Sequence, residues 1–512
     1  MLDLTLDLQQ RYENSTSAEV RKEKGQVFTP PEVARFMASL LSAIPVDYTL
    51  LDPGAGVGCL TAAVCERVLR LRSARRLMAH LFENDPKLLP LLRRNLEHCK
   101  QLLCQAGHAL DYVIHEEDFI LAASSGLGEQ RRFDQPRFDV RFDAVVMNPP
   151  YFKVRKGSTY ARLMSPVVHG QPNVYAFFLA LAARHLKEGG ELVAITPRSF
   201  CNGLYFRSFR QWFFSRVALD HIHLFESRTD TFEHSDVLQE SVITKVHRLG
   251  VPSRRITVTT SRGRDLNGDL ARSEVAAERI VDDSCGESVI RIPERAYDHE
   301  IMRLAESFPS RFSELGLRIS TGPVVMFRAT EFLLQAPQEV GSVPLLLPHN
   351  VKPFETIWPV SKNGKPAAFR LCNDSLRLLL PTRNYVLLKR FSAKEEKRRL
   401  VAGCLLRAHH AVSHVGIENH LNYVCHVERE LSEDEVFGIA AFFNSALLDR
   451  YFRTISGSTQ VNATEIRAMR FPDLKTLRRI GGQVKRDRSS AEAAVLSELG
   501  VATSLRQQLL CH

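Results

Sequence analysis

The chain has 512 residues and a mass of 57.9 kDa, which is too long for one ordinary core, so two or three domains are expected. Apolar residues make up 44% and charged residues 25%, which excludes wholesale disorder, and no apolar run reaches the length of about 18 residues that a membrane-spanning helix needs. Lys and Arg outnumber Asp and Glu by 68 to 58, and this excess favours a polyanionic partner. Ten scattered cysteines without a CxxC pair, and an N-terminus without a signal-peptide pattern, predict a cytoplasmic protein with reduced thiols and no metal site.

Short apolar runs alternate with helical patterns through the first half of the chain. Residues 1–25 are polar and charged, and are expected to form an N-terminal arm or a short helix. Five later runs have the composition of buried strands: Thr49–Asp52, Leu77–Glu83, Phe142–Met147, Glu191–Thr196 and His221–Phe225. Strands that alternate with helices predict an α/β fold, in which a mostly parallel sheet is covered on both faces. Ligands of such sheets bind beyond the carboxyl ends of the strands.

Two segments between these runs have helical spacing. In Pro31–Leu41 the apolar residues recur at i, i+3, i+4 and i+7, and Val174–Lys187 is expected to be a second helix that ends at Gly189-Gly190. Residues 251–300 are polar and are predicted to form a connector or a peripheral hairpin. Residues 301–512 contain apolar runs separated by basic clusters, and are expected to form a second domain.

Small and acidic residues follow the first two strands. Asp52 ends the first strand, and glycines at 54, 56 and 58 let the next loop turn sharply and approach a ligand. This loop lacks the GxGxxG pattern of dinucleotide-binding proteins and the Lys of a P-loop. Glu83, at the end of the second strand, is placed to accept both hydroxyl protons of a ribose. Taken singly, these features are equally typical of a surface turn and a solvated charge.

The run Phe142–Met147 leads directly into Asn148-Pro149-Pro150-Tyr151. Two prolines stiffen the backbone and remove two donors, which leaves the side-chain oxygen of Asn148 and the carbonyls of the turn as acceptors. Such acceptors suit the NH2 group of a substrate, and Tyr151 can stack on a planar base. The alternative is a strand-end turn with a surface tyrosine. The preceding glycine loop and strand-end acid favour the functional interpretation.

A family resemblance rests on five segments: FTPPEVARFM (28–37), LDPGAGVG (51–58), FENDPKLL (82–89), EDF (117–119) and NPPYF (148–152). Their order resembles that of the N6-adenine DNA methyltransferases of the gamma arrangement, the group of the TaqI and PstI modification enzymes. The resemblance implies a Rossmann-like, seven-stranded, mostly parallel sheet that binds S-adenosylmethionine, followed by a mixed α+β target-recognition domain. The implied boundaries are an arm at 1–25, a catalytic domain at 26–250, a connector at 251–300 and the recognition domain at 301–512.

The same resemblance implies roles for individual residues. The cofactor would contact Thr29, Asp52, Gly54, Gly56, Gly58, Glu83, Asp118, Phe119 and Asn148. Asn148 and the carbonyl of Pro149 would bind the two hydrogens of the adenine N6 amine after the base has flipped out of the duplex. Tyr151 and Phe232 would stack on the flipped base. Phe225 is a second candidate for the latter position, and core packing is nearly as good an explanation of Phe232.

Basic clusters in the second half suit phosphate contacts, which supply affinity without reading sequence. The residues expected to bind DNA are Lys394, Lys397, Arg398, Arg399, Arg478, Arg479, Lys485 and Arg486. A solvated helical face is the alternative for any one cluster. We therefore expect a monomeric, site-specific adenine DNA methyltransferase that acts on double-stranded DNA beside a separate restriction endonuclease. The alternative enzyme would methylate ribosomal RNA or a glutamine amide of a protein.

Overall fold

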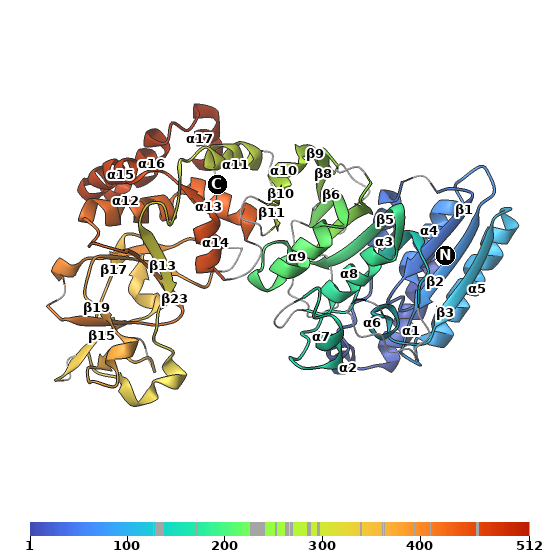
Figure 1. Cartoon of the computed structure of the whole chain (residues 1–512), viewed down its shortest axis with the longest axis horizontal. Coiled ribbons are helices and arrows are strands. Elements are labelled where there is room, and N and C mark those ends of the chain that lie inside the picture. Colours follow the sequence, from blue (N-terminus) through green and yellow to red (C-terminus); the bar gives the residue numbers. More distant parts are fainter. Residues whose placement is uncertain are drawn as a thin grey trace. The chain divides into compact units, whose positions relative to one another are not determined.

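The computed structural model describes residues 1–512 except 43, 126, 128–137, 169–172, 226–240, 251–252, 262–265, 267–269, 284–287, 294–296, 338–339, 361, 363, 393–395, 410, 457–459 and 511–512. The chain divides into two compact units, unit 1 from Met1 to Glu294 and unit 2 from Arg295 to His512 (Figure 1). Within the described ranges, no helix has both the length and the apolar character that a membrane crossing requires. Two residues with predicted roles, Phe232 and Lys394, lie outside the described residues.

The core of unit 1 is one large sheet. Among the described residues nine strands form it, in the order β3-β2-β1-β4-β5-β7-β6-β8-β9. Their bounds are β1 Asp47–Asp52, β2 Arg76–Phe82, β3 Ala109–His115, β4 Phe142–Met147, β5 Leu186–Pro197, β6 Val217–Phe225, β7 Ser241–Arg248, β8 Arg255–Ser261 and β9 Ala271–Ala276. The strands from β3 to β5 are parallel, whereas β7 runs antiparallel between β5 and β6. The expected mostly parallel α/β sheet is confirmed, but it has nine strands instead of seven.

The two additional strands come from the polar segment that was predicted to be a connector or a peripheral hairpin. β8 pairs in parallel with β6, and β9 pairs antiparallel with β8 at the sheet edge. Ile256, Val258 and Val275 are buried, whereas the charged residues of these strands, Arg255, Arg272 and Glu274, are exposed. Of the two predicted alternatives, the peripheral hairpin is confirmed for residues 255–276 and the connector is wrong, because a few inward side chains are enough to attach an otherwise polar edge strand.

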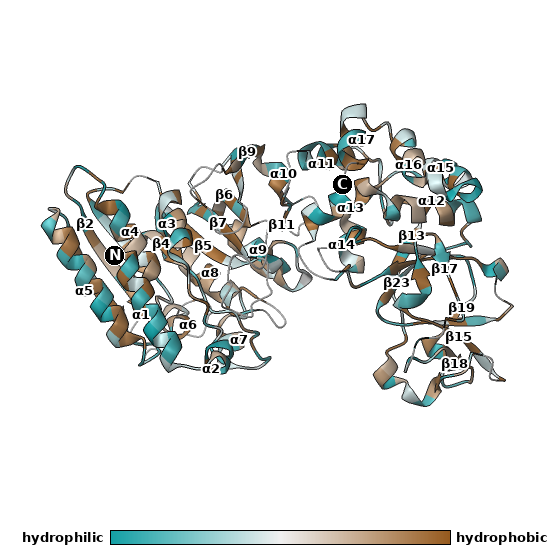
Figure 2. Ribbon diagram, turned by 180° about the vertical axis from the view of Figure 1, so that it is seen from behind, coloured by the Kyte–Doolittle hydropathy of each residue, from teal (hydrophilic) through white to brown (hydrophobic). Residues whose placement is uncertain are grey.

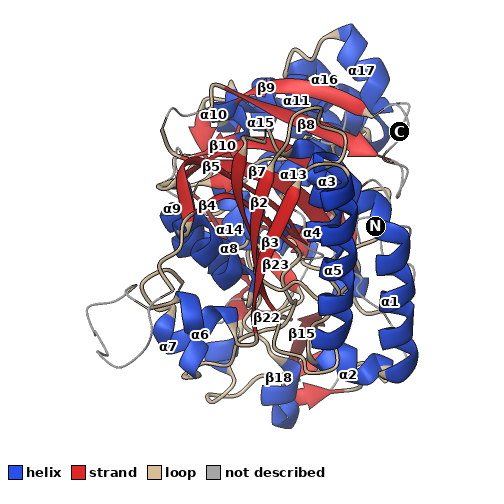
Figure 3. Cartoon of the chain, turned by 90° about the vertical axis from the view of Figure 1, so that its right-hand side faces the viewer, coloured by secondary structure: helices blue, strands red, loops and turns tan. Residues whose placement is uncertain are grey.

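Helices cover both faces of this sheet. Figure 3 shows α3, α4 and α5 on one side of the strands, and α8 and α9 on the other. The helices of unit 1 are α1 Leu2–Ser15, α2 Ala18–Glu23, α3 Pro31–Leu40, α4 Cys59–Val68, α5 Leu89–Gln105, α6 Phe119–Ala123, α7 Thr159–Leu163, α8 Tyr175–Arg184, α9 Arg207–Phe214 and α10 Ala277–Ile280. Most of β4 and the second half of β5 are apolar and buried on both faces, whereas hydrophilic and hydrophobic residues alternate along α5 (Figure 2).

The N-terminal segment belongs to unit 1 and is not a separate arm. Helix α1 packs against α3, α4 and α5 (Figure 3), and it buries Leu2, Thr5, Leu8 and Tyr12. These residues recur at intervals of three and four, which places them on one face of the helix. Of the two predicted alternatives, the helix is confirmed and the separate arm is wrong, because the polar composition of the segment concealed this stripe.

The boundary after α8 also differs from the prediction. The helix ends at Arg184, and Gly189 and Gly190 lie inside β5. A Cβ atom on Gly190 would lie 2.8 Å from the carbonyl oxygen of Phe142 in the neighbouring strand. The glycine therefore permits close approach of β4 and β5 and does not end a helix.

Among its described residues, unit 2 contains a four-stranded sheet, a five-stranded sheet and a group of helices at its C-terminal end, with two further strand pairs, β12 Ser310–Arg311 with β24 Arg470–Phe471 and β16 Val351–Lys352 with β17 Glu355–Thr356. One sheet has the order β13-β23-β20-β21, and the other β14-β18-β15-β22-β19. The strands of these sheets are β13 Leu317–Thr321, β14 Leu333–Leu334, β15 Ser342–Leu346, β18 Ala368–Arg370, β19 Leu380–Pro381, β20 Tyr385–Lys389, β21 Ala402–Leu405, β22 His414–Ile417 and β23 Leu421–His426. The helices are α11 Asp298–Glu306, α12 Glu433–Asn444, α13 Ala446–Ile455, α14 Ala463–Ala468, α15 Leu474–Arg486, α16 Ala491–Glu498 and α17 Thr503–Leu510. Helices α12 and α15 pack closely through Gly438 and Gly481, where a Cβ atom would meet the backbone of the opposite helix within 2 Å.

Candidate active site

A cavity of about 500 Å³ lies at the carboxyl ends of β1, β2 and β4 in unit 1. Segments 23–29, 53–60, 82–88, 117–120 and 148–152 contribute most of its lining. Seven predicted residues line it: Thr29, Gly54, Gly56, Glu83, Asp118, Phe119 and Asn148. Four predicted residues do not: Asp52, Gly58, Pro149 and Tyr151. The structure thus brings the strand-end residues of separate motifs together, as a parallel sheet requires.

The three glycines of the loop after β1 have different roles. All three have positive φ angles, +146° at Gly54, +57° at Gly56 and +82° at Gly58, which a side chain would strain. The backbones of Gly54 and Gly56 face the cavity. Gly58 precedes α4, and a Cβ atom there would lie 2.9 Å from Leu92 of α5. Gly58 is therefore required for helix packing, and the other two glycines shape the cavity.

Glu83 is a buried acid on the cavity wall. Its carboxylate accepts hydrogen bonds from the backbone nitrogens of Gly56 at 2.9 Å and Asp85 at 2.7 Å. Burial raises the pKa of the carboxyl group to about 7, although these hydrogen bonds oppose the shift. Each carboxylate oxygen retains a lone pair, so the group can still accept a hydrogen bond from a ligand.

Asp52 lies behind the glycine loop and is 1% exposed. One carboxylate oxygen accepts a hydrogen bond from the hydroxyl of Thr61 at 2.8 Å, and the other has no partner among the described residues. Burial raises the pKa of Asp52 to about 7. A buried acid with an unpartnered oxygen is unfavourable for folding alone, and such groups concentrate at functional sites.

Asp118 and Phe119 begin α6 at another wall of the cavity. One oxygen of Asp118 accepts from the backbone nitrogen of Leu121 at 3.0 Å and caps the helix, and the other accepts from the hydroxyl of Tyr160. Phe119 is buried and packs edge-on against Phe82, with the ring centroids 5.1 Å apart. The sequence did not reveal Tyr160, which lines the cavity and holds Asp118.

The side chain of Asn148 is fixed in the turn after β4. Its amide nitrogen donates to the carbonyl oxygen of Val27 at 2.8 Å and to the hydroxyl of Thr29 at 3.0 Å. Its carbonyl oxygen accepts from the hydroxyl of Tyr151 at 2.7 Å. Because the carbonyl of Val27 can only accept, the NH2 group must face it, and the side-chain oxygen points the other way.

Tyr151 is half-buried and does not line the cavity. Its hydroxyl is also 3.1 Å from the carbonyl oxygen of Ile195, and its ring packs edge-on against Tyr175. Burial raises the pKa of this hydroxyl, so Tyr151 is neutral. Phe225, the second candidate for base stacking, ends β6 and packs edge-on against His223 with the ring centroids 4.8 Å apart.

Sequence reasoning missed a polar network beside the cavity. Asp85 is 4% exposed and accepts hydrogen bonds from the side chains of Tyr12, Lys24 and Gln26. Asp85 belongs to the segment FENDPKLL of the family resemblance, but no role was predicted for it. Its partners Tyr12, Lys24 and Gln26 lie 73, 61 and 59 positions earlier in the chain, so no local pattern marks them.

Comparisons with known proteins place this site in a family. A family model of Eco57I restriction-modification methylases matches residues 70–232. The type II methyltransferase M.PstI of Providencia stuartii is 35% identical over 485 residues, which are 94% of this chain and 94% of the relative. The type II methyltransferase M.BsuBI of Bacillus subtilis is 36% identical over 499 residues, which are 94% of this chain and 96% of the relative.

The chain belongs to the type II DNA methyltransferases of restriction-modification systems. The resemblance found in the sequence motifs is thereby confirmed. A solved structure of the type IIL restriction-modification enzyme MmeI in complex with DNA has the same fold, with a TM-score of 0.53 and 11% identity over 90% of this chain and 68% of that one.

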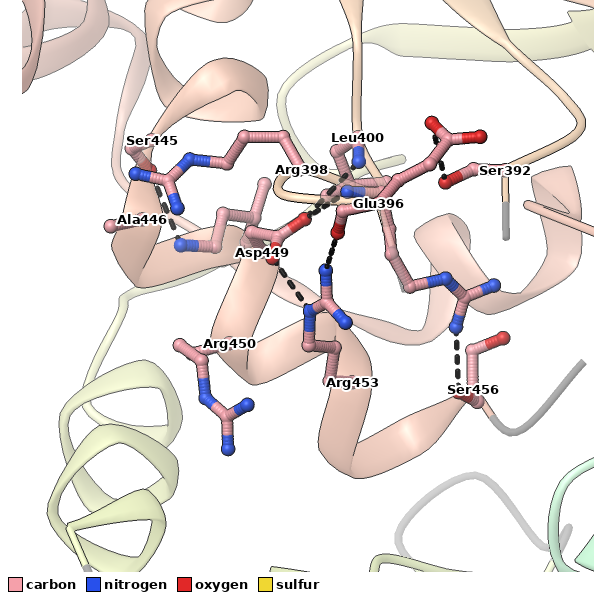
Figure 4. A network of polar contacts seen from close by, with 12 residues as sticks. Ser392, Glu396, Arg398, Leu400, Ser445, Ala446, Asp449, Arg450, Arg453 and Ser456 are labelled. Carbon is pink, nitrogen blue, oxygen red and sulfur yellow. Dashed lines mark hydrogen bonds and ion pairs between the residues drawn. The ribbon is translucent and has the colours of Figure 1, made fainter. Parts of the chain in front are cut away.

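One residue of this methyltransferase that was expected to bind DNA lies in the interior of unit 2. Arg399 is 1% exposed, and its guanidinium donates to the carbonyl oxygen of Ser456 at 2.8 Å. Its backbone nitrogen donates to Asp449, which also accepts from the side chain of Arg453 at 2.8 Å; Figure 4 shows Asp449 between Leu400 and Arg453. The prediction was wrong for Arg399, because a basic run in the sequence does not show which of its residues pack inward.

Four other predicted cations form ion pairs with acidic side chains. Arg478 binds Glu435 at 2.8 Å, Arg479 binds Glu498 at 2.8 Å, Lys485 binds Glu433, and Arg398 lies 3.8 Å from Glu492. Although burial opposes it, hydrogen bonds from Arg429 and Arg478 lower the pKa of Glu435 to about 2. Lys397 and Arg486 are exposed and make no ion pair within the described part of the chain.

Proposed function

We propose that this methyltransferase transfers the methyl group of S-adenosylmethionine to the N6 amine of adenine at a specific site in duplex DNA. The observation that carries the proposal is the geometry of Asn148. Its amide nitrogen is held by Val27 and Thr29 at the cavity wall, and its oxygen, which accepts from the hydroxyl of Tyr151, keeps a second lone pair for a substrate amine. Asn148 lines the same cavity as Glu83, the acid suited to the cofactor ribose.

The residues around the cavity fit S-adenosylmethionine. Glu83 would hold the ribose hydroxyls, Asp118 and Phe119 would hold the adenine, and the backbone of Gly54 and Gly56 would lie along the methionine part. Thr29 would lie at the methionine end. The unpartnered oxygen of buried Asp52 adds negative potential behind the loop, which suits a cationic ligand. When bound, the cofactor supplies a methyl group on a sulfonium sulfur.

Asn148 and Pro149 would activate the target amine. The lone pair of an exocyclic adenine amine is delocalised into the ring, which makes the nitrogen a poor nucleophile. The side-chain oxygen of Asn148 and the carbonyl of Pro149 would accept its two hydrogens, draw the nitrogen toward tetrahedral geometry and localise the lone pair. This is catalysis by position and electrostatics, without a covalent intermediate on the protein.

The target adenine would reach this site by flipping out of the duplex, which costs a few kcal/mol. Stacking on an aromatic side chain offsets roughly 1–3 kcal/mol per base. Tyr151 and Phe232 are the proposed stacking residues; Phe232 is proposed from the family resemblance alone. The tyrosine hydroxyl has an alternative acceptor in the carbonyl of Ile195, so Asn148 can release it when the target amine arrives.

Unit 2 is proposed to hold the duplex and to select its sequence. The cations best placed for phosphate contacts are the exposed Lys397 and Arg486, because the others with described positions have acidic partners or are buried. Lys394 remains a proposed contact. We also propose that the enzyme acts as a monomer beside a separate endonuclease of the same system. Sedimentation of the purified protein tests its oligomeric state. No observation favours ribosomal RNA or a glutamine amide as the substrate.

Sequencing that detects modified bases in the DNA of a host expressing the enzyme tests this function. The expected result is N6-methyladenine at one short motif, absent from a host that expresses the Asn148→Ala variant. Modification of cytosine at N4, or no modified DNA base with full protein expression, would overturn the proposal.

A further inference from the structure

We propose that Asp85 is a positioning residue, which holds residues 24–29, here called the strap, against the catalytic turn and thereby orients Asn148. This inference rests on the proposed role of Asn148. Nothing in the chemistry assigned to Glu83 or to the glycine loop requires Asp85. The contacts at the two ends of the strap suggest the connection.

Asp85 anchors the first end of the strap. One of its carboxylate oxygens accepts from the ammonium group of Lys24 at 2.6 Å and the amide of Gln26 at 3.3 Å. The same oxygen accepts from the hydroxyl of Tyr12 in α1 at 2.7 Å. Hydrogen bonds from Lys24 and Tyr12 overcome the effect of burial and lower the pKa of Asp85 to about 2, so the acid is ionised at any physiological pH. A buried, ionised acid with several charged and polar donors is a rigid anchor.

The strap reaches the catalytic turn at three further points. The carbonyl oxygen of Gly25 accepts from the backbone nitrogen of Tyr151 at 3.1 Å. The carbonyl oxygen of Val27 and the hydroxyl of Thr29 accept from the amide of Asn148 at 2.8 and 3.0 Å. Gly25 has a φ of +64°, and a Cβ atom there would lie 2.8 Å from the nitrogen of Tyr151. The strap therefore lies directly on the turn, with no space for a side chain between them.

The strap decides which end of the Asn148 amide faces the substrate. Without the acceptor at Val27 the amide could rotate and present its NH2 group to the target amine. Two groups that only donate cannot pair with each other, so the rotated amide could not activate the amine. Because Lys24 and Thr29 are only five positions apart, displacement of the strap at Asp85 moves the acceptors that fix Asn148.

Asp85 also contacts the proposed ribose acid. Its backbone nitrogen donates to the carboxylate of Glu83 at 2.7 Å. The residue thus connects the acid at the end of β2 with the asparagine at the end of β4 by way of the strap. Loss of its side-chain charge is expected to loosen the strap and to leave the backbone contact with Glu83 in place.

Hydrogen exchange of the cofactor-free protein tests the anchor without any assay of activity. In Asp85→Asn, the backbone amide of Tyr151 should exchange roughly tenfold faster or more, because a hydrogen bond to a charged group is lost at the other end of the strap. Lys24→Met should have the same effect and Lys24→Arg a smaller one. The matched control is Glu66→Gln, which breaks a different N-terminal contact, the ion pair with Arg35 at 3.0 Å. Unchanged exchange at Tyr151 in folded Asp85→Asn and Lys24→Met would overturn the proposal.

A kinetic double-mutant cycle tests whether Asp85 acts through Asn148. Single-turnover methyl transfer is measured with saturating cofactor and DNA for Asp85→Asn, Thr29→Val and the double variant. If the strap couples them, the double variant should be slowed much less than the product of the two single effects. The rate reductions caused by Asp85→Asn and by the control Glu66→Gln should multiply in their double variant. If the rate reductions of Asp85→Asn and Thr29→Val also multiply, the coupling is overturned.

If the wild-type enzyme transfers no methyl group to DNA, the proposed function fails, and the exchange experiment still decides the role of Asp85.

Discussion

The carboxylate of Glu83 accepts a hydrogen bond from the backbone nitrogen of Gly56, 2.9 Å away. The two residues follow different strands and meet because β1 and β2 are adjacent and parallel, with Asp52 opposite Leu81. The glycine loop therefore positions the acid before any ligand binds. An acid oriented in advance contributes more to affinity than one that must first be ordered.

The first prediction concerns cofactor affinity. Replacing Glu83 by Gln should weaken S-adenosylmethionine binding roughly tenfold or more, because a charge-assisted hydrogen bond to the ribose becomes a neutral one. Since the pKa of Glu83 in the free protein is about 7, wild-type affinity should rise between pH 6 and pH 8 as the acid ionises. Calorimetry across this range should show a smaller rise for the variant, in which Asp52 still titrates near pH 7. A wild-type affinity independent of pH would place the ribose elsewhere.

The second prediction concerns stability without cofactor. The pKa of Glu83 and that of Asp52 are raised from 4.5 and 3.8 to about 7, so the folded protein holds protons that the unfolded chain has already released. Their contribution to the free energy of unfolding is complete below about pH 4 and is lost as the pH rises through 7. At about 1.4 kcal/mol per pKa unit, shifts of this size correspond to about 3–4 kcal/mol for each group. Melting temperatures at pH 5 and pH 8 should therefore fall more for the wild type than for Glu83→Gln.

The third prediction separates chemistry from binding. Asn148→Ala should slow methyl transfer by roughly 10²–10³-fold or more, because the amine loses an acceptor that acts in the transition state. Cofactor affinity should change little, since Glu83 and the glycine loop keep their geometry. Single-turnover assays and calorimetry on the same preparation give both quantities. Turnover at the wild-type rate would exclude Asn148 from the reaction.

Most of the residues that were predicted from the sequence and found at the cavity lie just after strands. Glu83 and Asn148 directly follow β2 and β4, and Gly54 and Gly56 lie in the loop after β1. A parallel sheet brings the carboxyl ends of its strands to one edge whatever the loops between them. The positions of these residues could therefore be predicted from local sequence patterns and one rule of sheet topology. The peripheral hairpin of β8 and β9 was one of two alternatives for its segment, and the sequence did not decide between them, because edge strands need few apolar residues.

Residues whose environment depends on distant partners could not be placed in this way. The buried guanidinium of Arg399 donates to the carbonyl oxygen of Ser456, 57 positions later. Asp85 is an anchor only because α1 and the strap fold back over β2. Neither partner is marked by composition or spacing.

The last prediction compares two arginines on one helix, Arg478 and Arg486 of α15. Arg486 is exposed at the end of the helix and makes no ion pair within the described residues, so it is free to contact a phosphate. Arg486→Gln should weaken binding to cognate and random duplex alike and reduce the slope of log affinity against log salt by about 0.9, the value of one phosphate contact.

Arg478→Gln is the matched control, because Arg478 binds the buried acid Glu435. It should lower stability by about 1 kcal/mol, since Arg429 still pairs with Glu435, and it should leave the salt slope unchanged. The reverse pattern, a reduced slope for Arg478→Gln and none for Arg486→Gln, would mean that phosphates displace the acidic partners and that the duplex binds along the paired face of α15.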